Sequence, residues 1–189
     1  MKIGLFFGSF NPIHTGHLIV ANTILNQTDM DQVWFVVSPQ NPLKKSNTLL
    51  HEFDRLHMVR MAIDDNPQFS VTDIEFRMPR PSYTIDTLTY LSEKYKNHTF
   101  VLIMGEDNLD NFSQWKNYEK IIEQYEVCMY PRIRSSFTSV AIPRLTFVKA
   151  PLLDISATFI RQSIKEGKSI KYLVPVEVEN YILSNQFFK

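Results

Sequence analysis

The chain has 189 residues, a formal net charge of zero at pH 7 and one cysteine, Cys128. A balanced charge argues against broad binding of DNA or RNA, which needs a basic surface, although it permits a local basic pocket. One cysteine excludes an intramolecular disulfide and suits a reducing compartment, and no apolar run is long enough to span a bilayer. No signal peptide precedes the first apolar run, so we expect a cytoplasmic protein without membrane or nucleic-acid partners.

Short apolar runs alternate with amphipathic stretches along the chain. The runs predicted as strands are Lys2–Phe7, Gln32–Ser38, Phe69–Thr72, Thr99–Met104, Glu126–Tyr130 and Leu145–Lys149. Helical spacing predicts helices over Thr15–Gln27, Glu52–Asp64 and Thr84–Tyr95, with further helical segments from Ile155 onward. Strands alternating with helices form right-handed βαβ units. We therefore predict an α/β fold, a single doubly wound, Rossmann-like parallel sheet, in one domain over 1–189 whose part over 155–189 is helical.

Apolar residues at helical spacing indicate which face of each helix is buried. In the first helix Leu18, Ala21 and Leu25 share a face. The second helix places Leu56, Val59 and Ile63 together, and the third carries Leu88 and Leu91 at the same spacing. We expect these faces to cover the sheet.

The segment from Gly8 to His17 reads Gly-Ser-Phe-Asn-Pro-Ile-His-Thr-Gly-His and joins the first strand to the first helix. The N–H groups and dipole of a helix start favour an anion. Gly8 lets the backbone bend and approach a ligand, and Gly16 removes a side chain between two histidines. His14 and His17 are three residues apart, so both can donate hydrogen bonds to one oxyanion. This segment predicts a phosphate site.

Two other interpretations of this segment are weaker. Its glycine spacing matches neither the dinucleotide fingerprint G-x-G-x-x-G nor the P-loop pattern. Two histidines could belong to a zinc site, but one cysteine and no nearby carboxylate leave the ligand set incomplete. We therefore predict no metal ion held by the protein itself.

A second segment reads Ile155-Ser156-Ala157-Thr158-Phe159-Ile160-Arg161. Ser156 is a good N-cap for the helix that follows. Thr158 and Arg161 lie three residues apart and share a helix face, which makes a hydroxyl and a guanidinium available to phosphates. Alone, this pattern is typical of an ordinary capped helix. Combined with the first segment, it predicts the other half of a triphosphate clamp.

The middle of the chain contains weaker signals. Lys44 and Lys45 follow Pro42 and, on composition, are most simply a solvated pair. Ser82 or Thr84 could cap a helix start, and Trp115 in a short polar segment often only packs. Acidic residues directly after a buried strand, such as Asp107, often bind ribose hydroxyls.

The first and second segments together resemble the signatures G-x-F-N/D-P-x-H-x-G-H and I-S-x-T-x-x-R of the nucleotidyltransferase superfamily, in its nicotinate-mononucleotide adenylyltransferase branch. The resemblance covers essentially the whole chain. It implies adenylyl transfer from ATP to nicotinate mononucleotide, giving nicotinate adenine dinucleotide and pyrophosphate. It also implies Mg²⁺ as a cofactor carried on the ATP phosphates.

The resemblance further implies roles for individual residues. Catalysis is implied for His14, His17 and Arg161. The positions implied for ATP are Gly8, Ser9, Phe10, His14, His17, Gly105, Asp107, Ile155, Ser156, Thr158 and Arg161. Those implied for the mononucleotide are Asn11, Lys44, Lys45, Ser82, Tyr83, Thr84, Trp115 and Arg132, with Trp115 stacking on the pyridine ring. This chain reads Pro-Leu-Lys-Lys where many relatives read Pro-Pro-His-Lys, so either lysine fits the basic position.

Several alternative functions stay open from the residues. The nearest are a nicotinamide-mononucleotide adenylyltransferase and a phosphopantetheine adenylyltransferase, although the latter typically has Thr in place of the first histidine. Cytidylyltransferases are further away. A non-catalytic nucleotide-binding protein is a remote alternative, because such a protein is expected to lose a histidine or the clamp arginine. An RNA-binding module is disfavoured by the zero net charge. The oligomeric state, including a homo-oligomer, is not predicted.

Overall fold

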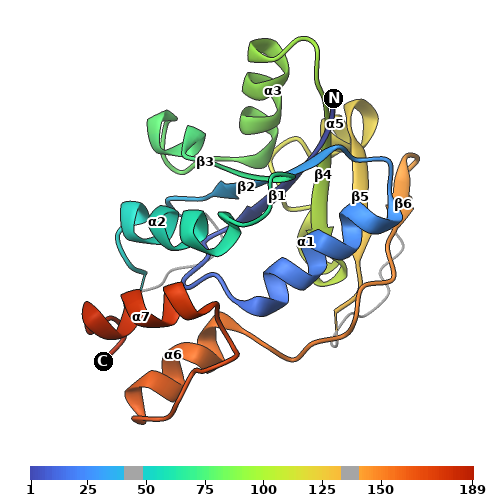
Figure 1. Cartoon of the computed structure of the whole chain (residues 1–189). Coiled ribbons are helices and arrows are strands. Elements are labelled where there is room, and N and C mark those ends of the chain that lie inside the picture. The colour runs from blue at the N-terminus through green and yellow to red at the C-terminus, as the bar shows by residue number, and fades with distance from the viewer. Residues whose placement is uncertain (41–48, 133–140) are drawn as a thin grey trace.

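A parallel β-sheet forms the centre of the computed structural model, which describes residues 1–40, 49–132 and 141–189 (Figure 1). Its strands are β1 (Lys2–Gly8), β2 (Gln32–Val37), β3 (Phe69–Thr72), β4 (Thr99–Gly105), β5 (Glu126–Tyr130) and β6 (Leu145–Phe147). They lie in the order β3-β2-β1-β4-β5-β6, and each adjacent pair is parallel. The predicted strands and the α/β fold are therefore confirmed, with strand ends shifted by one or two residues.

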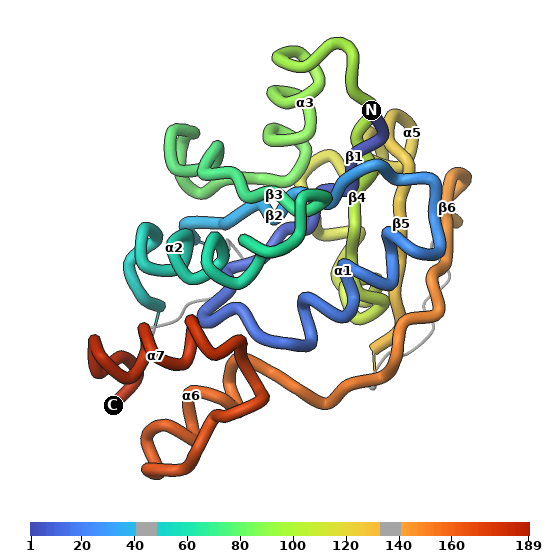
Figure 2. Tube along the Cα trace, in the orientation of Figure 1, coloured from blue at the N-terminus to red at the C-terminus, as the bar shows by residue number. Residues whose placement is uncertain are grey.

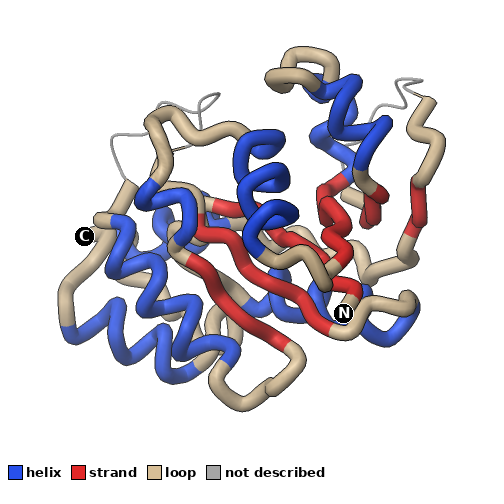
Figure 3. The backbone as a smooth tube through the Cα atoms, turned by 90° about the horizontal axis from the view of Figure 1, so that it is seen from above, coloured by secondary structure: helices blue, strands red, loops and turns tan. Residues whose placement is uncertain are grey.

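Helices pack on both faces of this sheet, and Figure 3 shows helices and strands from above. The helices are α1 (Thr15–Gln27), α2 (Glu52–Ile63), α3 (Thr84–Lys94), α4 (Leu109–Phe112), α5 (Tyr118–Gln124), α6 (Ala157–Lys165) and α7 (Val176–Ser184). Two 3₁₀ segments, η1 (Ile74–Arg77) and η2 (Glu106–Asn108), precede α3 and α4. The first three helices and the helical C-terminal part agree with the predictions. The short helices α4 and α5 were not predicted, because so few residues carry little periodicity.

Alternating strand residues build a separate core on each face of the sheet. Phe6 packs into the core formed with α1, α2, α6 and α7, whereas Leu5 packs into the core formed with α3, α4 and α5. Strands buried on both faces read as continuous apolar runs, which explains why the sequence pattern identified them.

The buried face of α1 differs from the predicted one. Ala21 is buried as expected, but Val20 and Ile24 fill the core beside it. Leu18 and Leu25 are only partly buried and pack at the margin of that core. The helix is apolar over more than one face, so spacing alone did not show which face would meet the sheet. In α2 and α3 the predicted residues Leu56, Val59, Ile63, Leu88 and Leu91 are buried.

A fully buried arginine joins α2 to the carboxyl ends of β1 and β2. Arg55 is 1% exposed, and its guanidinium donates to four backbone carbonyl oxygens. These are Ser9 at 2.6 Å, Ser38 at 2.8 Å, Pro39 at 3.0 Å and Leu50 at 3.0 Å. Burial lowers the pKa of Arg55 to about 10, which still leaves it charged at neutral pH. The side chain thus holds the turn after β1 against the segments on either side of residues 41–48.

No role was predicted for Arg55 from the sequence, although a signal was present. Arg55 stands three and four residues before the buried Met58 and Val59, so helical spacing places it on the buried face of α2. An arginine on such a face must find acceptors within the fold, because a buried charge without partners is very costly.

We predict that Arg55→Leu lowers the free energy of unfolding by about 3–5 kcal/mol, because it leaves buried carbonyl oxygens without donors. Urea unfolding measured by circular dichroism provides the test. The matched control is Arg60→Leu at an exposed position of the same helix, for which we expect less than about 1 kcal/mol. A loss for Arg55→Leu no larger than that of the control would contradict the assigned role.

Candidate active site

The predicted phosphate segment lies where the strand order of the sheet reverses. From β1 the chain passes outward to β2 and β3 on one side, and β4, β5 and β6 follow on the other side. The turn after β1 and the segment after β4 therefore meet beyond adjacent carboxyl ends. Ligands of open α/β sheets bind at this kind of position.

The turn after β1 is shaped by Phe10, whose φ of 45° lies in the left-handed region. The Phe10 ring is 2% exposed and packs on the rings of Phe6 and Phe35, with centroids 6.0 and 5.6 Å away. A Cβ on Gly8 would lie 2.7 Å from this ring. Gly8 is thus the extended last residue of β1 rather than a bend, and it is needed to admit the Phe10 ring. A left-handed non-glycine residue costs roughly 1–3 kcal/mol and often marks a functional turn.

The two histidines stack on each other at the start of α1. Their ring centroids are 3.7 Å apart with an interplanar angle of 25°. The backbone N–H of His14 donates to Nδ1 of His17 at 3.2 Å, so a neutral His17 carries its proton on Nε2. A Cβ on Gly16 would lie 3.1 Å from Nδ1 of His14, so the missing side chain leaves room for the His14 imidazole.

Both histidines are held in the neutral form. Burial, with a smaller effect of the positive charge on Arg132, lowers the pKa of His14 to about 4. Burial, followed by the charges of His14 and Arg132, holds the pKa of His17 well below its ordinary value. His14 is 4% exposed, and its Nδ1 has no hydrogen-bond partner within the described part of the chain. Each neutral imidazole can donate one hydrogen bond to an anion.

The second predicted segment reaches the same turn. Ser156 caps α6 by accepting a hydrogen bond from the Phe159 N–H at 3.2 Å, as predicted. Arg161 donates from Nη1 to the carbonyl oxygen of Asn11 at 2.7 Å and from Nη2 to the Thr158 hydroxyl at 3.2 Å. In Figure 2 the orange segment after β6 runs back toward the start of α1. The two segments, 150 residues apart at this contact, therefore form one site.

A small cavity lies against the stacked imidazoles, and we call it the histidine cavity. Its lining includes His14, Gly16, His17, Arg132 and Ile155. Arg132, which was predicted to contact the mononucleotide, lies beside the histidines in this lining. Its Nε lies 3.8 Å from a carboxylate oxygen of Asp107 in η2, which directly follows β4. Positive charge from Arg132 and hydrogen-bond donors from the imidazoles are thus brought together here.

A larger cavity, the α3 cavity, opens beside the start of α3. Its lining includes Gly8, Ser9, Ser38, Glu75, Ser82, Tyr83, Thr84, Asp107, Trp115 and Lys116. The structure therefore groups the predicted mononucleotide residues Ser82, Tyr83, Thr84 and Trp115 around one space. Asp107, predicted for the adenosine part of ATP, lines this cavity as well. The turn after β1 contributes to both cavities, which makes them neighbours.

The start of α3 is built differently from the prediction. Tyr83 is its N-cap residue, and no side chain of this residue caps the helix. Neither Ser82 nor Thr84 takes the capping role, because the N-cap position falls on Tyr83 between them. The Ser82 hydroxyl instead donates to the buried carboxylate of Glu75 at 2.7 Å. The first turn of α3 faces a cavity, and a helix start without a side-chain cap is suited to an anionic group.

Aromatic and basic side chains complete the wall of the α3 cavity. The Trp115 ring packs edge-on against the buried Phe112, with centroids 5.2 Å apart, and so is held in place. Lys116 lies over the Tyr83 ring, with Nζ 4.8 Å from its centroid, and pairs with Asp86 at 2.8 Å. Lys116 and Glu75 were not predicted from the sequence, because a single charged residue in a turn or a short 3₁₀ segment gives no periodic signal.

The remaining predicted residues differ in their positions. Asn11 is buried, and its side-chain oxygen accepts the N–H of Leu50 at 3.1 Å, so it helps to hold the turn after β1. Gly105 ends β4, and a Cβ there would meet the Asp107 carboxylate. Lys44 and Lys45 lie outside the described residues.

Over the three described ranges, no group of three or more His, Cys, Asp or Glu side chains could hold a metal ion. No helix in those ranges has the length and apolarity to cross a membrane.

Comparisons with known proteins agree on one family. Residues 5–163 match the cytidylyltransferase-like family model. A Cytophaga hutchinsonii protein named "Probable nicotinate-nucleotide adenylyltransferase" is 59% identical over 189 residues, which cover 100% of this chain and 98% of the relative. A Flavobacterium johnsoniae protein of the same name is 52% identical over the full length of both chains.

Solved structures share the fold. The Plasmodium falciparum nicotinic acid mononucleotide adenylyltransferase complexed with NaAD superposes with a TM-score of 0.83 at 20% identity, covering 99% of this chain and 97% of the other. At this identity the match establishes the doubly wound fold.

The burial of His14 predicts how the free energy of unfolding depends on pH. In the unfolded chain the His14 imidazole takes up a proton near pH 6.5, whereas in the native protein it stays neutral down to about pH 4. Its contribution to stability is therefore present above pH 6.5 and is lost as the pH falls toward 4. Between pH 7 and 5 we expect His14→Asn to lose about 2 kcal/mol less unfolding free energy than the wild type. Urea unfolding at both pH values measures this difference, and equal losses would contradict it.

Proposed function

The chain belongs to the cytidylyltransferase-like family and, within it, to the nicotinate-nucleotide adenylyltransferases, and we propose on this basis that it transfers the adenylyl group of ATP to nicotinate mononucleotide. The products are nicotinate adenine dinucleotide and pyrophosphate. The dinucleotide is an intermediate in the formation of pyridine nucleotide coenzymes, so the enzyme acts in NAD biosynthesis.

One observation of the structure carries this proposal. Arg161 of α6 donates to the Asn11 carbonyl at 2.7 Å, on the turn that leads to the stacked His14 and His17. A guanidinium, two imidazoles and two helix starts are thereby gathered where parallel strands reverse their order. Such a set of donors and positive charge is suited to a polyphosphate chain. The α3 cavity beside it offers a flat aromatic wall and a helix start, which suit a carboxylated ring.

We propose the following division of the site. His14, His17 and Arg161 act on the phosphates of ATP, together with the turn Gly8–Phe10 and the segment Ile155–Thr158. Gly105 and Asp107 hold the adenosine part. Asn11, Ser82, Tyr83, Thr84 and Trp115 bind the mononucleotide, with Lys44 or Lys45 adding a contact to its phosphate. Arg132 lines the histidine cavity, so we extend its role to the phosphate that passes between the two substrates.

The chemistry requires positioning rather than a protein nucleophile. A phosphate oxygen of the mononucleotide attacks the α-phosphorus of ATP and forms the new P–O bond. The bond from the α-phosphorus to the bridging oxygen breaks, and pyrophosphate leaves with the electron pair. A phosphate monoester is largely a dianion at pH 7, so no strong general base is needed. Donors arranged beforehand around the α-phosphate stabilise the charge that builds there.

Neutral imidazoles suit this role. His17 is fixed as an Nε2–H donor because its Nδ1 accepts the His14 N–H. An approaching phosphate raises the pKa of both imidazoles toward the ordinary value, since opposite charge favours the protonated form. The imidazoles can therefore strengthen their hydrogen bonds as negative charge develops.

We propose Mg²⁺ as the cofactor, brought to the site on the ATP phosphates. It would offset charge on the leaving pyrophosphate. Since the described residues offer no cluster of metal-ligating side chains, the substrate phosphates and water would supply its ligands. Arg161 and Arg132 then add positive charge from the protein.

We also propose that residues 1–189 act as one nucleotidyltransferase domain, because the C-terminal helix α6 completes the site begun after β1. The reduced, buried thiol of Cys128 is compatible with the cytoplasm.

The substrate class is tested by pyrophosphate release from ATP and Mg²⁺ with one acceptor at a time. The acceptors are nicotinate mononucleotide, nicotinamide mononucleotide and phosphopantetheine. We expect kcat/KM for the acid to exceed that for the amide by at least about tenfold, because a carboxylate at the start of α3 gains from the helix dipole. Faster turnover of the amide or of phosphopantetheine would overturn the proposed substrate.

We predict that His17→Asn and His17→Ala both lower kcat by about two orders of magnitude or more, the scale of losing one transition-state donor. Asn keeps an acceptor near the position of Nδ1 and so retains the hydrogen bond from the His14 N–H. The unfolding free energy of the His17→Asn protein should therefore stay within about 1 kcal/mol of that of the wild type. Steady-state kinetics and urea unfolding separate the two effects. A His17→Asn protein with kcat within a few-fold of the wild type would remove His17 from the mechanism.

A further inference from the structure

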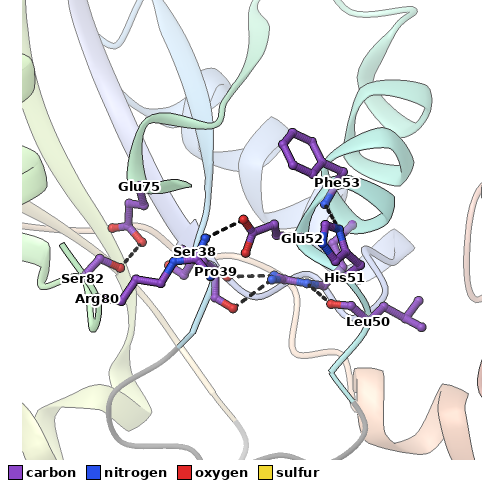
Figure 4. A network of polar contacts seen from close by, with 10 residues as sticks. Ser38, Pro39, Leu50, His51, Glu52, Phe53, Glu75, Arg80 and Ser82 are labelled. Carbon is purple, nitrogen blue, oxygen red and sulfur yellow. Dashed lines mark hydrogen bonds and ion pairs between the residues drawn. The ribbon is translucent and has the colours of Figure 1, made fainter. Parts of the chain in front are cut away.

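A buried carboxylate forms part of the α3 cavity wall without any role assigned so far. Glu75 lies in η1 and is 2% exposed. Its Oε2 accepts the Ser82 hydroxyl at 2.7 Å, and its Oε1 accepts the Thr87 hydroxyl at 2.8 Å. Ser38 lines the same cavity as Glu75. Figure 4 shows the bond between Glu75 and Ser82 close to Ser38 and Pro39.

Both hydroxyls that bind Glu75 lie at the start of α3, and Ser38 lies near them in the cavity wall. Ser38 follows β2, Ser82 precedes α3, and Thr87 belongs to the first turns of α3. Ser82 is 6% exposed and Thr87 is 0% exposed, so water competes little for these bonds. Glu75 therefore fixes the start of α3, with the tripeptide Ser82-Tyr83-Thr84, relative to η1.

The burial of this carboxylate is costly unless it is well hydrogen-bonded. Burial raises the pKa of Glu75, and the hydroxyls of Ser82, Thr87 and Ser38 act in the opposite direction. A leucine or methionine would fill the same place at lower cost, so the polar group is best explained by the geometry that it imposes. Hydrogen bonds to a carboxylate are shorter and more directional than apolar contacts.

We propose that Glu75 is a positioning residue for substrate specificity: it holds Ser82 and Thr87 so that the start of α3 can receive the carboxylate of the pyridine ring. The inference rests on the proposed function, because it takes nicotinate mononucleotide as the ligand of the α3 cavity. Glu75 acts through the Ser82-Tyr83-Thr84 segment and not on the reacting phosphates.

The test variant is Glu75→Gln, which keeps the size of the side chain. Its amide N–H₂ would face a hydroxyl that donates to the carboxylate in the wild type. Calorimetry measures Kd for nicotinate mononucleotide and for nicotinamide mononucleotide, and steady-state kinetics follow pyrophosphate release. We expect Kd and KM for the acid to rise at least about tenfold, the scale of losing a hydrogen bond to a charged group. Kd for the amide, KM for ATP and kcat should change by less than about threefold, so the preference for the acid falls.

Thr87→Val is the second variant, because it removes one hydroxyl donor in a residue of nearly equal shape. We expect the same direction with a smaller rise, about threefold, in Kd for the acid. The matched control is Asp73→Asn, one residue before η1, whose carboxylate pairs with the exposed Arg77. This control should leave both Kd values unchanged.

The outcomes separate the inference from the proposed function. An equal loss of affinity for the acid and the amide, or a fall in kcat alone with lower stability, would show a merely structural role and overturn the inference. Wild-type protein that binds the acid but releases no pyrophosphate would overturn the proposed function and leave the inference standing. Wild-type protein that binds neither mononucleotide would overturn both.

Discussion

The site depends on one buried positive charge whose hydrogen bonds, among the described residues, go to backbone oxygens. The Arg55 guanidinium donates to carbonyls that follow β1 and β2 and to one that precedes its own helix. A planar group with five N–H donors can join such segments at fixed angles, which an ammonium group could not do. The turn after β1 is thereby held to α2 from one side. Its left-handed Phe10 persists because the surrounding contacts fix it, and the imidazoles that follow are placed by this turn.

A second guanidinium holds the same turn from the other side. Arg55 binds the carbonyl of Ser9, and Arg161 binds the carbonyl of Asn11 two residues later. Carbonyl oxygens carry partial negative charge and would repel a phosphate beside them. Two cations bound to these oxygens offset that repulsion and leave the surroundings electropositive. The distant segments of the chain are thus coupled through the backbone of one turn, and the arginine from α6 need not touch the histidines to act with them.

The sequence predicted what periodicity and local chemistry determine. The strands are buried on both faces, so their apolar runs stood out, and Ser156, Thr158 and Arg161 make the local contacts that their spacing required. The sequence could not show which distant segments would be in contact. Glu75 and Arg55 are charged residues whose partners lie in other elements, and Gly8 is explained only by the ring of Phe10 packing onto it. Ser82 or Thr84 could cap a helix start, but α3 begins at Thr84 with Tyr83 at the N-cap, and the Ser82 hydroxyl donates to Glu75 in a neighbouring element.

The electrostatics of the two cavities suggest why the site keeps its histidines neutral. Positive charges on Arg132 and Arg161 already attract a polyphosphate, so charged imidazoles would bind the ground state more tightly without lowering the barrier. Neutral imidazoles instead donate hydrogen bonds that strengthen as charge moves onto the α-phosphate. Burial and Arg132 lower the pKa of both groups before the substrate arrives. The same burial that costs stability at low pH therefore reserves part of the binding energy for the transition state.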